Sequence, residues 1–192
     1  EDYLPRLLES VKKQAFGQDA SKAGSAGLPV SKDYEIIISD AGSTDATLEI
    51  AKKYHCIITK GGLPAKGRNS GAKIAKGDLL FFLDADTMLP DYFLHKSLQE
   101  FNTRNLDIAS FCIAPYPYKL LARFLIELFY NKMIVFLEKI LPHSATGILI
   151  KKKLFNDLGG YREDITLSED HELGRRAVKI ATFGIIRSAR IM

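Results

Sequence analysis

Residues 78–86 are Asp-Leu-Leu-Phe-Phe-Leu-Asp-Ala-Asp, an apolar run that ends in two carboxylates separated by one residue. Such a run predicts a fully buried strand of a parallel sheet. In open α/β sheets, ligands bind just past the carboxyl ends of these strands. Asp84 and Asp86 stand at that position, where two acids can hold a hard divalent cation that in turn holds a diphosphate. Acids also end many strands that bind nothing, so this interpretation depends on further motifs.

The pattern around this run alternates between strands and helices. Helical spacing covers 2–15 and the Gly- and Ser-rich segment 17–33 predicts a loop. Strands are predicted at 34–39, 56–59, 78–83 and 106–113, and helices from Ser43 or Thr44 to 54, at 66–76 and at 91–101. This alternation predicts an α/β fold with a mainly parallel sheet.

Length and composition limit the possible classes of protein. With 192 residues, 46% of them hydrophobic, the chain can form one sizeable core and we expect a single domain over 1–192. The net charge of +4 gives no argument for nucleic-acid binding. Cys56 and Cys112 lack zinc-type spacing, which favours two reduced thiols in a cytoplasmic protein. The chain opens on a helix where such folds usually open on a strand, so we expect truncation at both ends, with the first strand missing.

A second motif precedes the acid pair. The segment 34–47 ends a strand at Asp40, and Gly42 permits a tight turn into the next helix. The Asp40 carboxylate could then accept a hydrogen bond from the N–H of a nucleotide base at the sheet edge. Farther on, Lys66 and Arg68 open a helix near the same edge, where they could contact phosphate.

A third motif lies at 166–173, Thr-Leu-Ser-Glu-Asp-His-Glu-Leu. Acids at a helix start are favourable, so we expect Glu169 and Glu172 to cap a helix. Asp170 is the candidate general base. Glu169 and His171 are candidate accessory residues, His171 for a metal or a diphosphate.

In order and spacing these motifs resemble the family 2 glycosyltransferases of the GT-A fold. The resemblance rests on the turn from Asp40 to Asp45, the helix start from Ala65 to Gly71, the Asp-x-Asp at 84–86, and Gly159-Gly160-Tyr161 before the Glu-Asp pair at 169–170. It implies a Rossmann-like three-layer fold with a mainly parallel central sheet.

The resemblance also implies roles for these residues. Asp40 would contact the base of a UDP- or GDP-sugar, and Arg68, with Lys66, would lie by the base or the diphosphate. Asp84 would contact ribose or metal, and Asp86 the Mg²⁺ or Mn²⁺ that bridges the diphosphate. Asp170 would deprotonate the acceptor in a single displacement with inversion at the anomeric carbon.

One departure from the family pattern concerns processivity. Processive members carry Gln-x-x-Arg-Trp after the base, whereas this chain continues Leu-Gly-Arg-Arg-Ala-Val at 173–178 and has no Trp. We therefore expect transfer of one sugar without polymerisation.

The segment 116–141 is an apolar, amphipathic helical stretch with Lys119, Arg123 and Glu127 on one face. Charges interrupt it too often for a transmembrane span. Two interpretations stay open: a peripheral helix at the inner face of the membrane, or a helix that packs in the protein or a dimer. The membrane interpretation would favour a lipid-linked acceptor such as polyprenyl phosphate over a saccharide acceptor.

Two alternative functions remain from the sequence. A sugar-nucleotidyltransferase shares the sheet and an Asp-rich metal site. A response-regulator receiver would use Asp86 as phospho-acceptor, but it needs an acid pair after its first strand and leaves 169–170 without a purpose.

Overall fold

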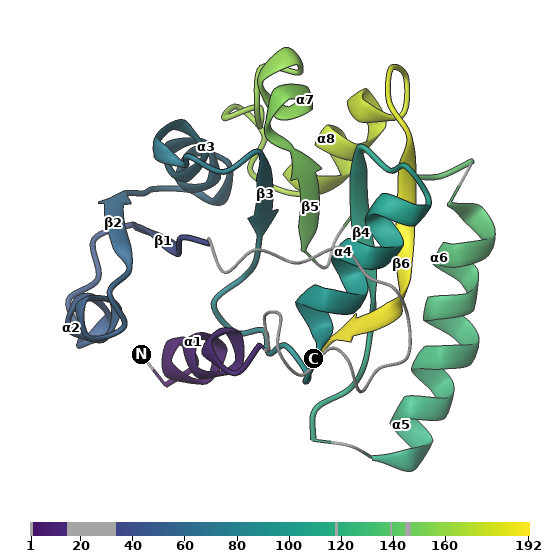
Figure 1. Ribbon diagram of the computed structural model, residues 1–192, viewed down its shortest axis with the longest axis horizontal. Coiled ribbons are helices and arrows are strands. Elements are labelled where there is room, and N and C mark those ends of the chain that lie inside the picture. Colours follow the sequence, from purple (N-terminus) through teal and green to yellow (C-terminus); the bar gives the residue numbers. More distant parts are fainter. Residues whose placement is uncertain (1, 15–33, 118, 139, 145–146) are drawn as a thin grey trace.

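The structure is a computed structural model that describes residues 2–14, 34–117, 119–138, 140–144 and 147–192, so the predicted loop at 17–33 lies outside the described residues. It is an α/β fold, as expected (Figure 1). The six strands are β1 (Ile37–Asp40), β2 (Ile57–Lys60), β3 (Leu79–Phe82), β4 (Ile108–Ile113), β5 (Ile148–Lys151) and β6 (Phe183–Ile191).

The helices occupy most of the predicted segments. They are α1 (Leu4–Lys12), α2 (Thr47–Lys53), α3 (Pro64–Ile74), α4 (Phe93–Thr103), α5 (Leu120–Leu125), the π-helix η2 (Ile126–Asn131), α6 (Lys132–Leu137), α7 (Lys152–Asp157) and α8 (Glu169–Ala177). Predicted and observed ends differ by a few residues, because side-chain patterns mark helix ends poorly.

The strands form two sheets, a parallel pair β1-β2 and a four-stranded sheet in the order β3-β5-β4-β6. In the larger sheet only β4 and β6 are parallel, because β5 runs antiparallel to both β3 and β4. The apolar run therefore does form a strand, but the prediction of a fully buried parallel one was wrong. Among the described strands β3 lies at the sheet edge, and Leu79 is 37% exposed.

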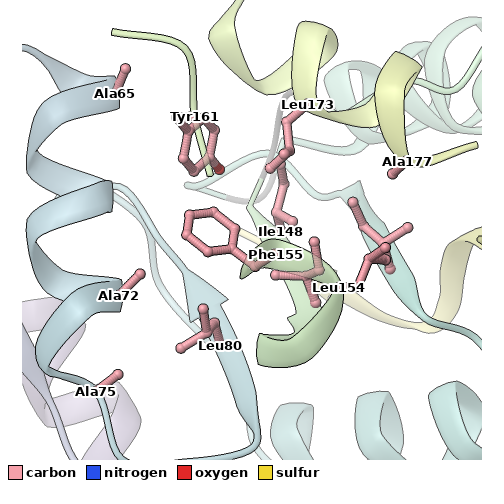
Figure 2. Packing of buried hydrophobic residues seen from close by; sticks show 12 residues of the cluster. Ala65, Ala72, Ala75, Leu80, Ile148, Leu154, Phe155, Tyr161, Leu173 and Ala177 are labelled. Carbon is pink, nitrogen blue, oxygen red and sulfur yellow. The ribbon is translucent and has the colours of Figure 1, made fainter. Parts of the chain in front are cut away.

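Two cores lie on opposite faces of the larger sheet, because successive strand residues point to opposite sides. Ile148 and Ile150 belong to one core, and Leu149 between them belongs to the other. The first core packs α3, α7 and α8 against the sheet; Figure 2 shows Ala65 and Ala72 of α3 facing Phe155 and Tyr161. The second core packs α1 and α4 on the other face, which gives three layers.

The turn after β1 follows the sequence prediction only in part. Gly42 has a φ of 103°, a conformation that glycine adopts without strain. The predicted cap at Ser43 or Thr44 was wrong, since α2 begins at Thr47. Instead Asp45 Oδ1 accepts a hydrogen bond of 3.0 Å from the Thr47 N–H.

The segment 116–141 is helical from Leu120 to Leu137, with the π-helix η2 in its middle. In Figure 1 this helix lies along the outer side of the molecule beside β6. Within the described residues, no helix is both long and apolar enough to cross a bilayer.

Candidate functional site

Arg68 of α3 lies at the centre of a group of three carboxylates, which we call the acid cluster: Asp84, Glu169 and Asp170. One of its guanidinium nitrogens lies 2.8 Å from Asp84 Oδ1 and 3.5 Å from Asp170 Oδ2, and another donates to Glu169. Burial alone would lower the pKa of Arg68, but the nearby acids, Asp170 first, raise it above its usual value. The guanidinium therefore stays charged and joins the end of β3 to the start of α8.

Asp170 is a mostly buried carboxylate that accepts a hydrogen bond from a tyrosine. Its side chain is 16% exposed, and the Tyr161 hydroxyl donates to its Oδ1 over 2.9 Å. Burial raises the pKa of Asp170, while Arg68 and the tyrosine hydrogen bond oppose that rise. Burial and the neighbouring Asp170 also raise the pKa of Tyr161 well above its usual value, so the phenol stays protonated and remains a donor.

Tyr161 itself is fixed by Asn69 of α3, whose role the sequence analysis missed. The Asn69 side chain donates to the Tyr161 carbonyl and accepts from the Tyr161 N–H, both over 2.9 Å. Gly160 has a φ of 71°, and a Cβ there would lie 2.7 Å from Asn69 Oδ1. The Gly-Gly-Tyr motif at 159–161 therefore contacts the Arg-Asn motif at 68–69. The sequence alone does not show this contact, because the two motifs lie far apart along the chain.

The expectation that Glu169 and Glu172 cap α8 was wrong. Glu169 is buried and pairs with Arg68, and Glu172 pairs with Arg176 one turn later over 2.7 Å. His171 points to a different neighbourhood, where its ring lies 4.7 Å from the ring of His143. Of the two accessory candidates, only Glu169 is placed within the acid cluster.

Asp84 and Asp86 follow β3 as expected, but they face different neighbours. Asp84 is half-exposed and bonds to Arg68, whereas Asp86 lines a depression of about 160 Å³ together with Arg6 and Tyr116. Among the described residues, no three His, Cys, Asp or Glu side chains are grouped to hold a metal ion. Two exposed carboxylates still fit Mg²⁺ or Mn²⁺, because such ions often take one or two carboxylates and complete their shell with phosphate and water.

The two remaining candidates lie near α3. Asp40 ends β1 and accepts hydrogen bonds from the N–H groups of Gly42 (2.9 Å) and Ser43 (3.2 Å). A hydrogen bond from the Ser43 side chain, with these backbone bonds, lowers the pKa of Asp40, which stays ionised and is partly exposed. Lys66 is exposed in the first turn of α3, two residues from Arg68.

Comparison with known proteins identifies the family of this chain. The model of "Glycosyl transferase family 2" matches residues 1–161. The chain is 31% identical over 108 residues to the poly(ribitol-phosphate) beta-N-acetylglucosaminyltransferase TarS of Staphylococcus aureus, covering 52% of this chain and 16% of TarS. The chain thus spans about a sixth of the length of that relative.

Two solved structures have the same fold. S. aureus TarS 1-349 in complex with UDP-GlcNAc superposes with a TM-score of 0.68 at 23% identity, over 98% of this chain and 54% of that one. The mannosyltransferase PcManGT from Pyrobaculum calidifontis, in complex with GDP-Man and Mn²⁺, gives 0.70 at 17% identity, over 96% and 50%. The chain therefore belongs to glycosyl transferase family 2, and its fold is that of the GT-A glycosyltransferases.

Proposed function

We propose that this chain transfers one sugar from a UDP- or GDP-sugar to an acceptor hydroxyl, with inversion at the anomeric carbon and with Asp170 as the general base. The observation that carries the proposal is the environment of Asp170. Its carboxylate is mostly buried, its pKa is raised by that burial, and the Tyr161 hydroxyl donates a hydrogen bond to it over 2.9 Å. A carboxylate whose pKa lies nearer to neutral is a better proton acceptor in catalysis.

The proposed chemistry is one displacement. The acceptor oxygen forms a bond to the anomeric carbon as the bond to the diphosphate oxygen breaks. The acceptor proton passes to Asp170, and the nucleoside diphosphate leaves with the bonding electron pair. Attack from the face opposite the leaving group inverts the anomeric centre.

The other residues of the site bind and orient the donor in this proposal. Asp40 accepts a hydrogen bond from the base, while Arg68 and Lys66 contact the base or the diphosphate. Asp86 and Asp84 would hold Mg²⁺ or Mn²⁺, which when bound neutralises charge on the diphosphate. Glu169 keeps Arg68 in place.

The donor and acceptor classes follow the compared proteins by analogy. TarS binds UDP-GlcNAc in its solved structure and is named for a poly(ribitol-phosphate) acceptor, and PcManGT binds GDP-Man with Mn²⁺. We favour a saccharide or polyol hydroxyl as acceptor, with polyprenyl phosphate as the lipid-linked alternative. Transfer of a single sugar is expected.

Isothermal titration with UDP and GDP, each with and without Mn²⁺, tests the donor site. We expect Mn²⁺-dependent binding of one diphosphate, weakened about 10- to 100-fold in Asp86→Ala. Asp78→Ala is the matched control, because Asp78 is an exposed acid at the other end of the same strand. Equal binding by both variants, or no binding by the unaltered chain, would contradict the proposed donor site.

Asp170→Asn tests the base separately. It should keep diphosphate affinity and lose about 10²- to 10⁴-fold in kcat, since only the proton acceptor is removed. Transfer to a saccharide and to polyprenyl phosphate, followed by mass spectrometry, would identify the acceptor class. If kcat of Asp170→Asn equals that of the unaltered chain, another group accepts the proton.

A further inference from the structure

The helix from Leu120 to Leu137 and the residues that follow it expose an apolar face. Its large apolar side chains recur every three or four residues and point away from the protein body. Ten of them, 39% to 87% exposed, make up what we call the outer face: Leu120, Leu121, Phe124, Leu125, Leu128, Phe129, Met133, Phe136, Ile140 and Leu141. Monomeric soluble proteins seldom leave an apolar patch of this size open to water.

Polar residues of the same segment face inward, the reverse of an ordinary surface helix. Glu127 pairs with Arg190 of β6 over 3.0 Å. Asn131 is buried and exchanges two hydrogen bonds with the backbone of Ile113 at the end of β4, over 3.0 and 2.9 Å. Because these bonds fix the rotation of the helix, the outer face cannot turn toward the core.

Basic residues flank the outer face. Lys119, Arg123 and Lys132 are exposed. Within the part of the chain that the structure describes, none of the three forms an ion pair, and Glu127 of the same helix is bonded to Arg190 instead. A face that combines exposed Phe and Leu with unpaired cations complements an anionic lipid surface.

All exposed charged residues in the described part of 119–144 are basic, and this pattern favours an anionic bilayer over a protein partner. The helix is about 27 Å long at 1.5 Å per residue and lies on the outside of the molecule (Figure 1). It is interrupted by charges and is not a candidate to span a membrane. It is suited to lie in the plane of the headgroups.

We propose that the outer face docks this protein onto the surface of an anionic lipid bilayer. The docked helix is connected to the proposed base: the Tyr130 hydroxyl lies 2.6 Å from His143 Nε2, and the His143 ring packs on His171, next to Asp170. This inference rests on the proposed function only in that a docked chain could reach an acceptor held at the membrane.

Flotation with vesicles tests the docking in the absence of any nucleotide, so its outcome is independent of the donor site. We expect the chain to float with vesicles of phosphatidylcholine and phosphatidylglycerol, less with pure phosphatidylcholine, and less at high salt. The double variant Phe129→Ser/Phe136→Ser should reduce binding about tenfold or more.

The matched control is Leu167→Ser/Ile180→Ser, which removes two side chains of similar exposure, 82% and 66%, outside the outer face. It should bind vesicles like the unaltered chain. Lys119→Glu/Lys132→Glu should weaken binding to anionic vesicles, whereas Lys179→Glu, an exposed lysine elsewhere, should not. Thermal unfolding of each variant shows that it is folded.

A single fluorophore gives a second measurement, because the chain contains no Trp. In Phe129→Trp the emission should shift to shorter wavelength with anionic vesicles and be quenched by brominated acyl chains; in Leu167→Trp neither should occur. Absence of binding to every vesicle would overturn the proposal. So would a dimer in light scattering that dissociates in Phe129→Ser/Phe136→Ser while vesicles stay unbound, since the outer face would then join two copies.

Discussion

At the scale of single residues, the site depends on hydrogen bonds that set the position and the charge of one carboxylate. Asp170 receives a hydrogen bond from Tyr161 and lies 3.5 Å from Arg68. Burial raises the pKa of Asp170, and these two partners lower it. A base must be ionised to accept a proton, so activity should fall as the pH drops through this pKa.

Tyr161→Phe should move that fall in activity to higher pH. The variant keeps the ring but removes the hydroxyl that stabilises the Asp170 carboxylate, so the pKa of Asp170 should rise further. The measurement is kcat against pH, compared with Tyr92→Phe, a partly exposed tyrosine outside the site. An unchanged pH profile would show that Tyr161 does not act on the base.

Gly160→Ala tests whether the two hydrogen bonds of Asn69 to the Tyr161 backbone position Tyr161. Gly159 and Gly160 both have positive φ, 75° and 71°, so alanine strains the backbone at either place by about 1–2 kcal/mol. Only at residue 160 would the Cβ also strike Asn69, at 2.7 Å, whereas no atom lies within 4 Å at residue 159. Gly160→Ala should therefore have a much lower kcat than Gly159→Ala. Equal kcat values would contradict the role of Asn69 in positioning Tyr161.

At the scale of secondary structure elements, Glu138 joins the end of α6 to the sheet. It is 8% exposed, pairs with Arg104 over 3.1 Å and Arg187 over 2.5 Å, and accepts from the Ile185 N–H over 3.0 Å. These contacts hold the helix against β6 in the orientation that leaves its apolar side outward.

Glu138→Gln should lower the free energy of unfolding by about 1–3 kcal/mol, because it removes the buried counter-ion of Arg187 and one of the two counter-ions of Arg104, which also pairs with Glu100. Asp157→Asn is the control, since it breaks an exposed pair one turn apart with Lys153 and should cost about 0.5 kcal/mol or less. Urea denaturation measures both. Equal losses would show that Glu138 is no more important than a surface pair.

At the scale of the whole molecule, two cores share one sheet but only one adjoins the site. Phe111 is fully buried against Phe81 and Phe93 on the α4 face. Phe155 is buried on the opposite face, where its ring lies 5.7 Å from the Tyr161 ring (Figure 2). A truncated side chain in either core should lower the free energy of unfolding. Only a truncation in the core that contains Phe155 should also displace Tyr161, the partner of Asp170.

Phe111→Ala and Phe155→Ala should each lower the free energy of unfolding by about 3–5 kcal/mol. At a temperature where both variants are folded, Phe155→Ala should also lower kcat, because Tyr161 loses a packing partner. Phe111→Ala should keep kcat close to that of the unaltered chain. Denaturation gives the loss of stability and kinetics give the loss of kcat for each variant. An equal loss of kcat in both variants would mean that the core around Phe155 has no special connection to the site.

Local sequence determined the kind of structure at most positions of this protein. The alternation of strand-like and helix-like patterns predicted the α/β class. Acids at strand ends marked Asp40, Asp84 and Asp86, and acids at a helix start marked Asp170. These signals extend over a few residues, which is why they could be recognised without the fold.

Only the tertiary structure decided how distant segments pair. It made β5 antiparallel to β3, turned Glu169 from an expected cap into a partner of Arg68 101 residues away, and joined Asn69 to Tyr161. It also turned the polar side chains Glu127, Asn131 and Glu138 of the segment 120–138 inward. Their partners lie on β6, on β4 and at Arg104, which follows α4. Long-range pairing of this kind depends on which buried polar groups can satisfy one another, and no local pattern records that.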